Sequence, residues 1–269
     1  MQIDQPVFVS MVSLLQESAL LEREIKIDLY MPPGDPSSAD LLLINDGQDL
    51  EKMSFAGILE QLYTKGNIRP VICAGIHAGS DRLNEYGCAG RPDYKGRGSR
   101  ADVYAAAIQN EILPAIYSCC KNISIQQRGF AGFSLGALSA LDMVWNHPAI
   151  FSLAGVFSGA LWWRSRDQYD REYNEWNDRI MHRQISEQPY KEGLRFFFEC
   201  GELDEMEDRN RNGVIDSIDD TLDIMRLLHR KGYREGSKMR YLQIPDGRHD
   251  IPSWGKALPS FFEWAFPSK

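Results

Sequence analysis

Residues 129–145 read GFAGFSLGALSALDMVW, and this stretch decides the fold. An apolar, strand-like run ends at Ser134, and a run of small and apolar residues suited to a buried helix follows it. The residues at the junction, 132–136, fit the pattern G-x-S-x-G. That pattern is typical of a sharp strand-to-helix turn that exposes a serine hydroxyl, with glycines on both sides leaving room for the tight backbone.

The rest of the chain alternates short apolar runs with amphipathic stretches. Strands are predicted over residues 24–30, 41–44, 70–76, 129–133, 153–157, 195–200 and 239–244. Helices are predicted over residues 102–117, 136–145, 219–230 and 254–266, with Pro114 bending or ending the first of them. The alternation indicates the α/β class. Together with the serine turn, it predicts an α/β-hydrolase fold with a mostly parallel central sheet and helices on both faces.

We expect residues 1–269 to form a single domain, because no linker, repeat or low-complexity tract interrupts the pattern. Residues 161–193 depart from the rhythm of strands and helices. They are rich in Trp, Tyr, Arg, Asp and Glu, and their apolar residues have little periodicity. We therefore predict that this segment is a lid-like insertion packed over one end of the sheet.

Charge and cysteine content narrow the classes of function. The formal net charge is −8 and the pI is near 5.2, which argues against a nucleic-acid partner and against acidic membrane surfaces. The five cysteines are odd in number and form no C-x-x-C pair, so we predict no structural disulfide and a reducing compartment. The first thirty residues lack a signal-peptide pattern, and no run is apolar enough to span a membrane. A cytoplasmic location is expected.

A serine nucleophile needs a base, and in this fold the acid and then the histidine follow the serine along the chain. His249 follows the last predicted strand after residues 245–248 and precedes the terminal helix, so it can reach the strand ends and accept the serine proton. The alternative is a surface-loop histidine. The remaining histidines have structural explanations or break the order: His77, His147, His182 and His229.

The acid should follow the strand predicted at residues 195–200. Asp204 is the first choice, because a Gly-x-x-Asp turn places its carboxylate just past the sheet end, where it can hold the histidine tautomer. Glu202 is the reserve candidate. A carboxylate in this turn that is not used in this way is expected to be solvated.

An oxyanion hole needs two N–H donors. The first should be the backbone N–H of Leu135, the residue after the nucleophile. The second should come from the loop after an early strand, and the N–H of Gln48 is our candidate because Gly47 lets the backbone approach closely. A plain turn is the alternative explanation for residues 46–48.

At these residues the chain resembles the putative-esterase family, which includes S-formylglutathione hydrolases, ferric enterobactin esterases, feruloyl esterases and mycolyltransferases. The likeness runs from about Ile25 to Phe266. It rests on the following matches: Asp46-Gly47-Gln48 in the oxyanion loop, Arg100, Tyr104, Glu111 and Pro114 in the helix before the nucleophile, residues 132–136 at the serine turn, Phe157-Ser158-Gly159 at the next strand end, and His249 with Trp254.

The resemblance implies that Ser134, Asp204 and His249 form a catalytic triad, and it leaves the substrate open. Two departures are visible. The family's usual Gly-Gly pair is Gly136-Ala137 here, and the spacing between His249 and Trp254 is longer than in the family's His-x-x-Trp tail.

Residues 208–219 read DRNRNGVIDSID, which is the layout of a calcium-binding loop. The expected ligands are side chains at loop positions 1, 3, 5, 9 and 12 and one backbone carbonyl, namely Asp208, Asn210, Asn212, Asp216, Asp219 and Val214. Gly213 stands at the sharp turn. The final Asp, where EF-hands use Glu, resembles dockerin-type loops. The alternative is an Asx-rich turn that caps the next helix.

These features predict a serine carboxylic-ester hydrolase that needs no catalytic cofactor, has a small-molecule ester as its partner and carries a structural Ca²⁺. An acyltransferase of the same fold and a non-catalytic binding module are the alternatives. Siderophore lactones, feruloyl sugars and thioesters all remain open as substrates. The candidate pocket residues are His77, Trp162, Trp163 and Trp254, and for the tryptophans of the insertion the alternative is a place in its core. Oligomeric state is not predicted.

Overall fold

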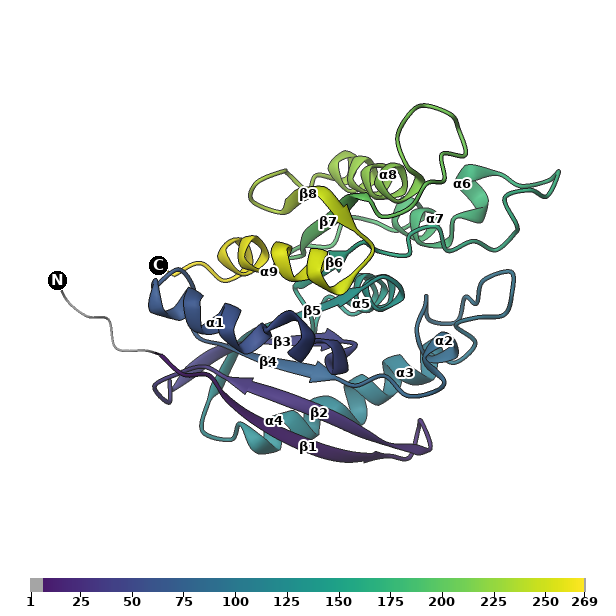
Figure 1. The fold of residues 1–269 in the computed structure, drawn as a ribbon. Helices are drawn as coiled ribbons and strands as arrows, with labels where there is room; N and C mark the ends of the chain where they lie inside the picture. The colour runs from purple at the N-terminus through teal and green to yellow at the C-terminus, as the bar shows by residue number, and fades with distance from the viewer. Residues whose placement is uncertain (1–6, 269) are drawn as a thin grey trace.

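In the computed structural model, which describes residues 7–268, the chain folds around one eight-stranded sheet (Figure 1). Its strands are β1 (Ser10–Ser18), β2 (Arg23–Met31), β3 (Ser38–Asn45), β4 (Val71–Ile76), β5 (Ser124–Phe133), β6 (Leu153–Phe157), β7 (Arg195–Leu203) and β8 (Met239–Arg248). Their order across the sheet is β1-β2-β4-β3-β5-β6-β7-β8. The pairs β1–β2 and β2–β4 are antiparallel, and every other pair is parallel. The predicted α/β class and the mostly parallel sheet are confirmed.

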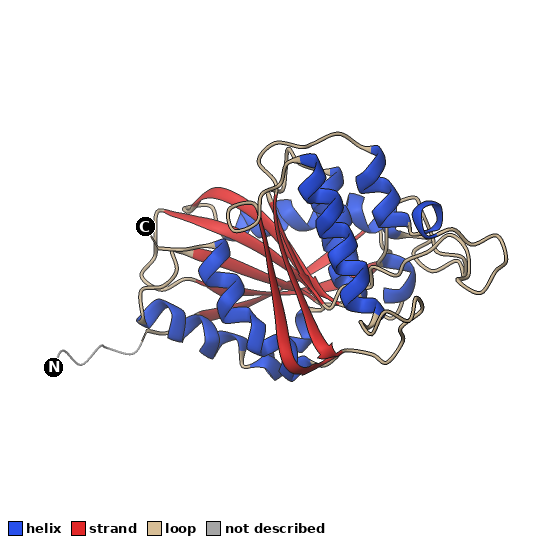
Figure 2. Cartoon of the chain, turned by 90° about the horizontal axis from the view of Figure 1, so that it is seen from above, coloured by secondary structure: helices blue, strands red, loops and turns tan. Residues whose placement is uncertain are grey.

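Helices cover both faces of the sheet, as the view from above makes plain (Figure 2). They are α1 (Phe55–Thr64), α2 (Arg82–Glu85), α3 (Ala101–Ala107), α4 (Leu113–Cys119), α5 (Leu135–Asn146), α6 (Glu175–Asp178), α7 (Ile180–Glu187), α8 (Asp216–Lys231) and α9 (Ile251–Ala265). Short 3₁₀ turns, η1 (Gly47–Asp49) and η2 (Glu51–Met53), precede α1. Helices α1 and α9 pack on one face, and α3, α4, α5 and α8 pack on the other.

No helix within residues 7–268 is both long enough and apolar enough to cross a lipid bilayer.

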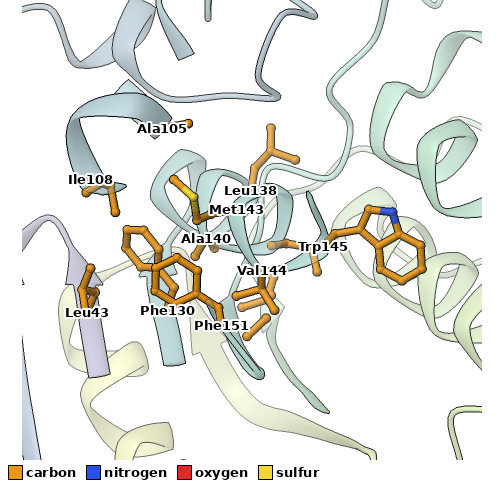
Figure 3. Close-up of a cluster of buried hydrophobic side chains, with 14 of the residues drawn as sticks. Leu43, Ala105, Ile108, Phe130, Leu138, Ala140, Met143, Val144, Trp145 and Phe151 are labelled. Atoms are coloured by element: carbon orange, nitrogen blue, oxygen red, sulfur yellow. The ribbon is translucent and has the colours of Figure 1, made fainter. Parts of the chain in front are cut away.

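The core beside the serine turn is built around α5. Every residue of this helix from Leu135 to Trp145 is buried, and small side chains such as Ala137 and Ala140 let the helix lie close to the sheet. Figure 3 shows Val144 of α5 beside Phe151, which packs on Phe130 of β5, while the Trp145 ring points away from this pair. Tight packing on both sides therefore fixes the turn that joins β5 to α5.

Three sequence predictions need correction. β1 was not predicted, because it is an edge strand whose residues are mostly exposed and so lack a clear apolar alternation. Residues 245–248 were expected to be a loop, but they belong to β8, whose pairing with β7 shifts register between Gly201 and Leu203. The helix predicted over residues 102–117 is divided by a π-helical turn, η3 (Ile108–Ile112), after which Pro114 lies in the first turn of α4.

Residues 161–193 contain α6 and α7, which lie beside α8 (Figure 1). Arg179, at the start of α7, is almost fully buried. Its guanidinium pairs with Asp220 at 2.8 Å and with Asp223 at 2.9 Å, both on α8. Buried, hydrogen-bonded ion pairs of this kind are costly to break, so they hold the segment against α8.

Candidate active site

Ser134 occupies the turn between β5 and α5 in a strained backbone conformation. Its φ is 54° and its ψ is −120°, values that non-glycine residues seldom adopt. A Cβ added at Gly132 would lie 2.4 Å from the carbonyl oxygen of Gly136, so the turn closes only with glycine at position 132. The Ser134 side chain is partly exposed at the carboxyl end of the parallel strands.

His249 lies directly over this serine. Its Nε2 is 2.8 Å from Ser134 Oγ, and its ring contacts the Trp254 ring edge-on at a centroid distance of 5.3 Å. Although His249 is exposed, partial desolvation by the surrounding protein lowers its pKa below the usual value. The imidazole is therefore neutral at neutral pH and can accept a proton from Ser134.

Asp204 is the first residue after β7 and lies close enough to His249 for each to influence the other's ionisation. Its Oδ2 accepts the Gly201 N–H at 3.1 Å, while its Oδ1 is buried and has no hydrogen-bond partner among residues 7–268. No hydrogen bond joins Asp204 to His249 within that range. Glu202 is exposed and pairs with Gln243 at 2.9 Å, so Asp204 is the better-placed of the two candidates.

Desolvation raises the pKa of Asp204, while the nearby Ser158 hydroxyl, the Gly201 N–H and the charge of His249 act in the opposite direction. These opposing influences leave the carboxyl group sensitive to its immediate neighbours.

The two predicted oxyanion donors lie on adjacent segments. Leu135 begins α5, and Gln48 lies in η1, where Gly47 packs so closely on β4 that an added Cβ would be 2.3 Å from the Gly75 carbonyl carbon. Neither the Gln48 N–H nor the Leu135 N–H is used in a hydrogen bond within residues 7–268. Both N–H groups are therefore free to bind a developing oxyanion.

Asn45, the last residue of β3, ties the oxyanion loop to the nucleophile turn. Its fully buried amide donates to the Gly136 carbonyl at 2.8 Å, and its Oδ1 accepts the Tyr104 hydroxyl at 2.6 Å. The next residue, Asp46, lies close to Gly136: a Cβ added at Gly136 would be 2.7 Å from Asp46 Oδ2. These contacts hold the loop that contains Gln48 against the start of α5, where Leu135 lies. We refer to Asn45 and Tyr104 together as the Asn45 clasp.

Arg82 completes the rim of the site. It forms two 2.7 Å hydrogen bonds with Asp46 and stacks over the Tyr86 ring at 4.9 Å. After desolvation, the largest influence, the positive charge of Arg82 also contributes to lowering the pKa of His249. Sequence reasoning missed both Arg82 and Asn45. The one available signal was a polar Asn at the end of the apolar run 41–44.

A family model described as "Putative esterase" matches residues 18–264, nearly the whole chain. The chain belongs to this esterase family. The match spans Ser134, Asp204 and His249 and the oxyanion loop, so the residues that meet at the strand ends all lie within the region that defines the family.

Solved structures show that the esterase shares its fold with several enzymes. The enterobactin esterase FES from Shigella flexneri, determined in the presence of enterobactin, has a TM-score of 0.74 at 19% identity over 97% of this chain and 60% of that one. The siderophore hydrolase EstB from Aspergillus nidulans has a TM-score of 0.69 at 15% identity, covering 100% of this chain and 99% of that one. A ferulic acid esterase has a TM-score of 0.68 at 16% identity, covering 97% and 98%.

The esterase therefore spans about three fifths of the Shigella enzyme, and its architecture is consistent with the α/β-hydrolase fold. A search of curated protein sequences found no match.

The predicted pocket residues of the esterase have different surroundings. Trp254 is largely buried, stacks on Phe133 at 5.2 Å and supports His249. Trp163 is fully buried, and its Nε1–H donates to the Arg91 carbonyl at 3.1 Å, so it belongs to the core of its segment, the alternative left open above. Trp162 is partly buried beneath Arg97.

His77 lines a cavity of about 370 Å³ that adjoins the oxyanion loop at Gly47 and Gln48. Its Nε2 lies 2.6 Å from Asp28 Oδ2. Tyr30 and Phe55 also line this cavity.

The predicted calcium loop has only part of its expected arrangement. The side-chain amides of Asn210 and Asn212 both donate to Asp219 Oδ2 at 2.7 Å, and Asp208 accepts the N–H groups of Asn212 and Gly213. Asp216 is instead the first residue of α8 and pairs with Arg209 at 3.1 Å.

The Val214 N–H donates to Asn212 Oδ1 at 2.8 Å. Within residues 7–268, no three His, Cys, Asp or Glu side chains are grouped to hold a metal ion. Amide and carbonyl oxygens would have to supply part of a calcium site here, and calcium binding remains a prediction from the sequence.

The Asn45 clasp can be tested with Tyr104→Phe, which removes one buried hydroxyl and leaves Asn45 Oδ1 without its donor. We expect the free energy of unfolding to fall by ~1–3 kcal/mol and kcat for a p-nitrophenyl ester to fall by about 10-fold, with KM nearly unchanged. Tyr63→Phe is the matched control, because its hydroxyl bonds the Val71 backbone away from the site. Equal losses of kcat in the two variants would contradict the assignment.

The calcium prediction can be tested by thermal melting of the esterase with excess Ca²⁺ and with a chelator. A site that binds calcium only in the folded state should raise Tm by about 5 °C at saturating Ca²⁺. Asp208→Ala should remove the difference, because it deletes the first ligand of the loop. Superimposable melting curves for the wild type in the two conditions would refute calcium binding.

Proposed function

We propose that this esterase is a serine carboxylic-ester hydrolase of the α/β-hydrolase fold that works through an acyl-enzyme on Ser134. The observation that carries the proposal is the 2.8 Å contact between His249 Nε2 and the hydroxyl of a serine held at φ 54°. A strained, exposed serine in contact with a neutral imidazole is the arrangement needed for nucleophilic attack on a carbonyl.

In the first half of the reaction, Ser134 Oγ attacks the carbonyl carbon of the ester while its proton passes to His249 Nε2. The negative charge that develops on the carbonyl oxygen is received by the N–H groups of Gln48 and Leu135. Collapse of this intermediate breaks the ester C–O bond. The alcohol leaves with the proton from His249, and the acyl group stays on Ser134.

In the second half, water takes the place of the alcohol. His249 removes a proton from the water, which attacks the acyl carbon, and returns that proton to Ser134 Oγ as the acid departs. The role we give Asp204 is to accept the Nδ1–H of His249 and to stabilise the imidazolium in both halves. The proximity of Asp204 to His249 and its unpartnered Oδ1 support that role.

The exposure of His249 favours hydrolysis over transfer to another alcohol, because bulk water can reach the base without displacing protein. The substrate class is open between siderophore and hydroxycinnamate esters. Structures similar to this one are named for both kinds of activity.

Replacement of the nucleophile is the primary test. We expect Ser134→Ala to lower kcat for short-chain p-nitrophenyl esters by about 10³–10⁶-fold and to abolish labelling by a fluorophosphonate probe. Ser118→Ala, which alters an exposed serine on α4, should leave both unchanged. Labelling that persists in Ser134→Ala would assign the nucleophile to another serine.

The pH dependence tests His249 as the base. Because burial lowers its pKa, the imidazole stays neutral to lower pH than an ordinary histidine, and the acid limb of kcat/KM should have its midpoint below 6.5. The measurement is kcat/KM against pH at low substrate concentration. A midpoint at or above 6.5 would be inconsistent with a desolvated base.

A further inference from the structure

A second carboxyl group, Glu199 on β7, lies beneath the active site and has no part in the mechanism above. Its side chain is 1% exposed, and no salt bridge within residues 7–268 involves it. Residue 199 points to the face covered by α9, next to the Phe157 position of β6. A carboxylate buried without a cation is costly, so the geometry itself favours a neutral acid.

Ser158 lies between Glu199 and the site. Its Oγ is 3.5 Å from Glu199 Oε2 and accepts the Trp254 Nε1–H at 3.0 Å. The same hydroxyl lies close enough to Asp204 to favour its ionised form, which lowers the pKa of that carboxyl. The Ser158 segment is tied to the nucleophile as well, because the Ala160 N–H donates to the Ser134 carbonyl at 3.0 Å.

The number of available hydrogens limits how Ser158, Glu199 and Asp204 can hydrogen-bond to one another. Ser158 has one O–H hydrogen, yet two carboxyl groups lie within its reach, and the Trp254 N–H already occupies one of its lone pairs. Glu199 Oε1 and Asp204 Oδ1 are both buried and have no hydrogen-bond partner among residues 7–268. If both acids were ionised, Ser158 could donate its hydrogen to only one of them, and the two charges would repel. A proton on one of the two acids supplies the second donor and removes the repulsion between the two charges.

We propose that Glu199 is a protonated positioning residue whose O–H donates to Ser158, so that the Ser158 hydrogen is directed to the Asp204 carboxylate beneath His249. Ionisation of Glu199 redirects that hydrogen to Glu199 and places a second negative charge beside Asp204. The Asp204 carboxylate is then displaced from His249, and the site loses the group that orients its base. The inference rests on the proposed function of Ser134 and His249.

The ionisation of Glu199 falls in an accessible pH range. Desolvation, followed by the charge of Asp204, raises the pKa of Glu199 to about 8. The titratable group whose charge acts on Glu199 is Asp204, just after β7. Tyr241 on β8 and Cys200 on β7 lie on the opposite face of the sheet, and neither carries a charge near that pH because burial raises the pKa of each. The charge of Asp204 is therefore the main electrostatic influence on Glu199.

The test is the pH profile of Glu199→Gln, whose amide keeps a donor and cannot ionise. We expect wild-type kcat for a p-nitrophenyl ester to fall above about pH 8 while KM stays constant. Glu199→Gln should keep wild-type kcat near pH 7 and lose this alkaline fall, and Glu199→Leu should lose it too. Asp142→Asn, which alters another fully enclosed acid far from His249, should retain it. Ser134→Ala supplies the blank for uncatalysed hydrolysis.

A second measurement does not depend on activity. Infrared difference spectra of wild type minus Glu199→Gln should contain the C=O stretch of a protonated carboxyl at neutral pH, and the band should disappear as the pH rises through about 8.

Absence of that band at neutral pH, or an alkaline fall of kcat that persists in Glu199→Gln, would overturn the inference. If the wild type hydrolyses no ester and resists the fluorophosphonate, the proposed function fails. The infrared band then still decides the protonation of Glu199.

Discussion

The turn at Ser134 is the constraint on which the rest of the structure depends. A non-glycine residue is held at positive φ between a buried strand and a buried helix, and the turn closes because Gly132 faces the backbone of Gly136 without a side chain. Strain of this kind persists only where packing over-determines it. Here α5 is buried along nearly all its length, so the energy of the core holds the serine in place.

The same turn organises the polar groups around it. On one side, Asn45 binds the Gly136 carbonyl and brings the oxyanion loop against the start of α5. On the other side, the Ser134 N–H donates to Phe157 at the end of β6, and the next residue, Ser158, is also at positive φ. Ser158 lies between the Ser134 turn and two acids, Glu199 on β7 and Asp204 just after it. The site is thus a set of strand ends whose polar residues meet because the strands are parallel and adjacent.

Two groups of acidic side chains differ in whether a positively charged side chain pairs with them. Near α8, Asp220 and Asp216 are buried but paired with Arg179 and Arg209, so they serve to attach the segment of residues 161–193. Glu199 is buried and Asp204 is half-buried, and within residues 7–268 neither pairs with an arginine or a lysine. Ion pairs suit the structural role because both charges are compensated, whereas uncompensated acids have pKa values that can change with pH.

The sequence by itself determined the strand–turn–helix at Ser134 and the α/β class, because these follow from local periodicity and from residue types that one turn geometry demands. It did not reveal β1, whose exposed edge leaves no apolar alternation, or the extension of β8 through residues 245–248, which depends on pairing with β7. Only the tertiary structure identified Asn45, Ser158 and Glu199 as neighbours of the site, and only it placed Trp163 in a core. The physical reason is that burial and proton sharing arise between strands far apart in the chain, and no local pattern encodes them.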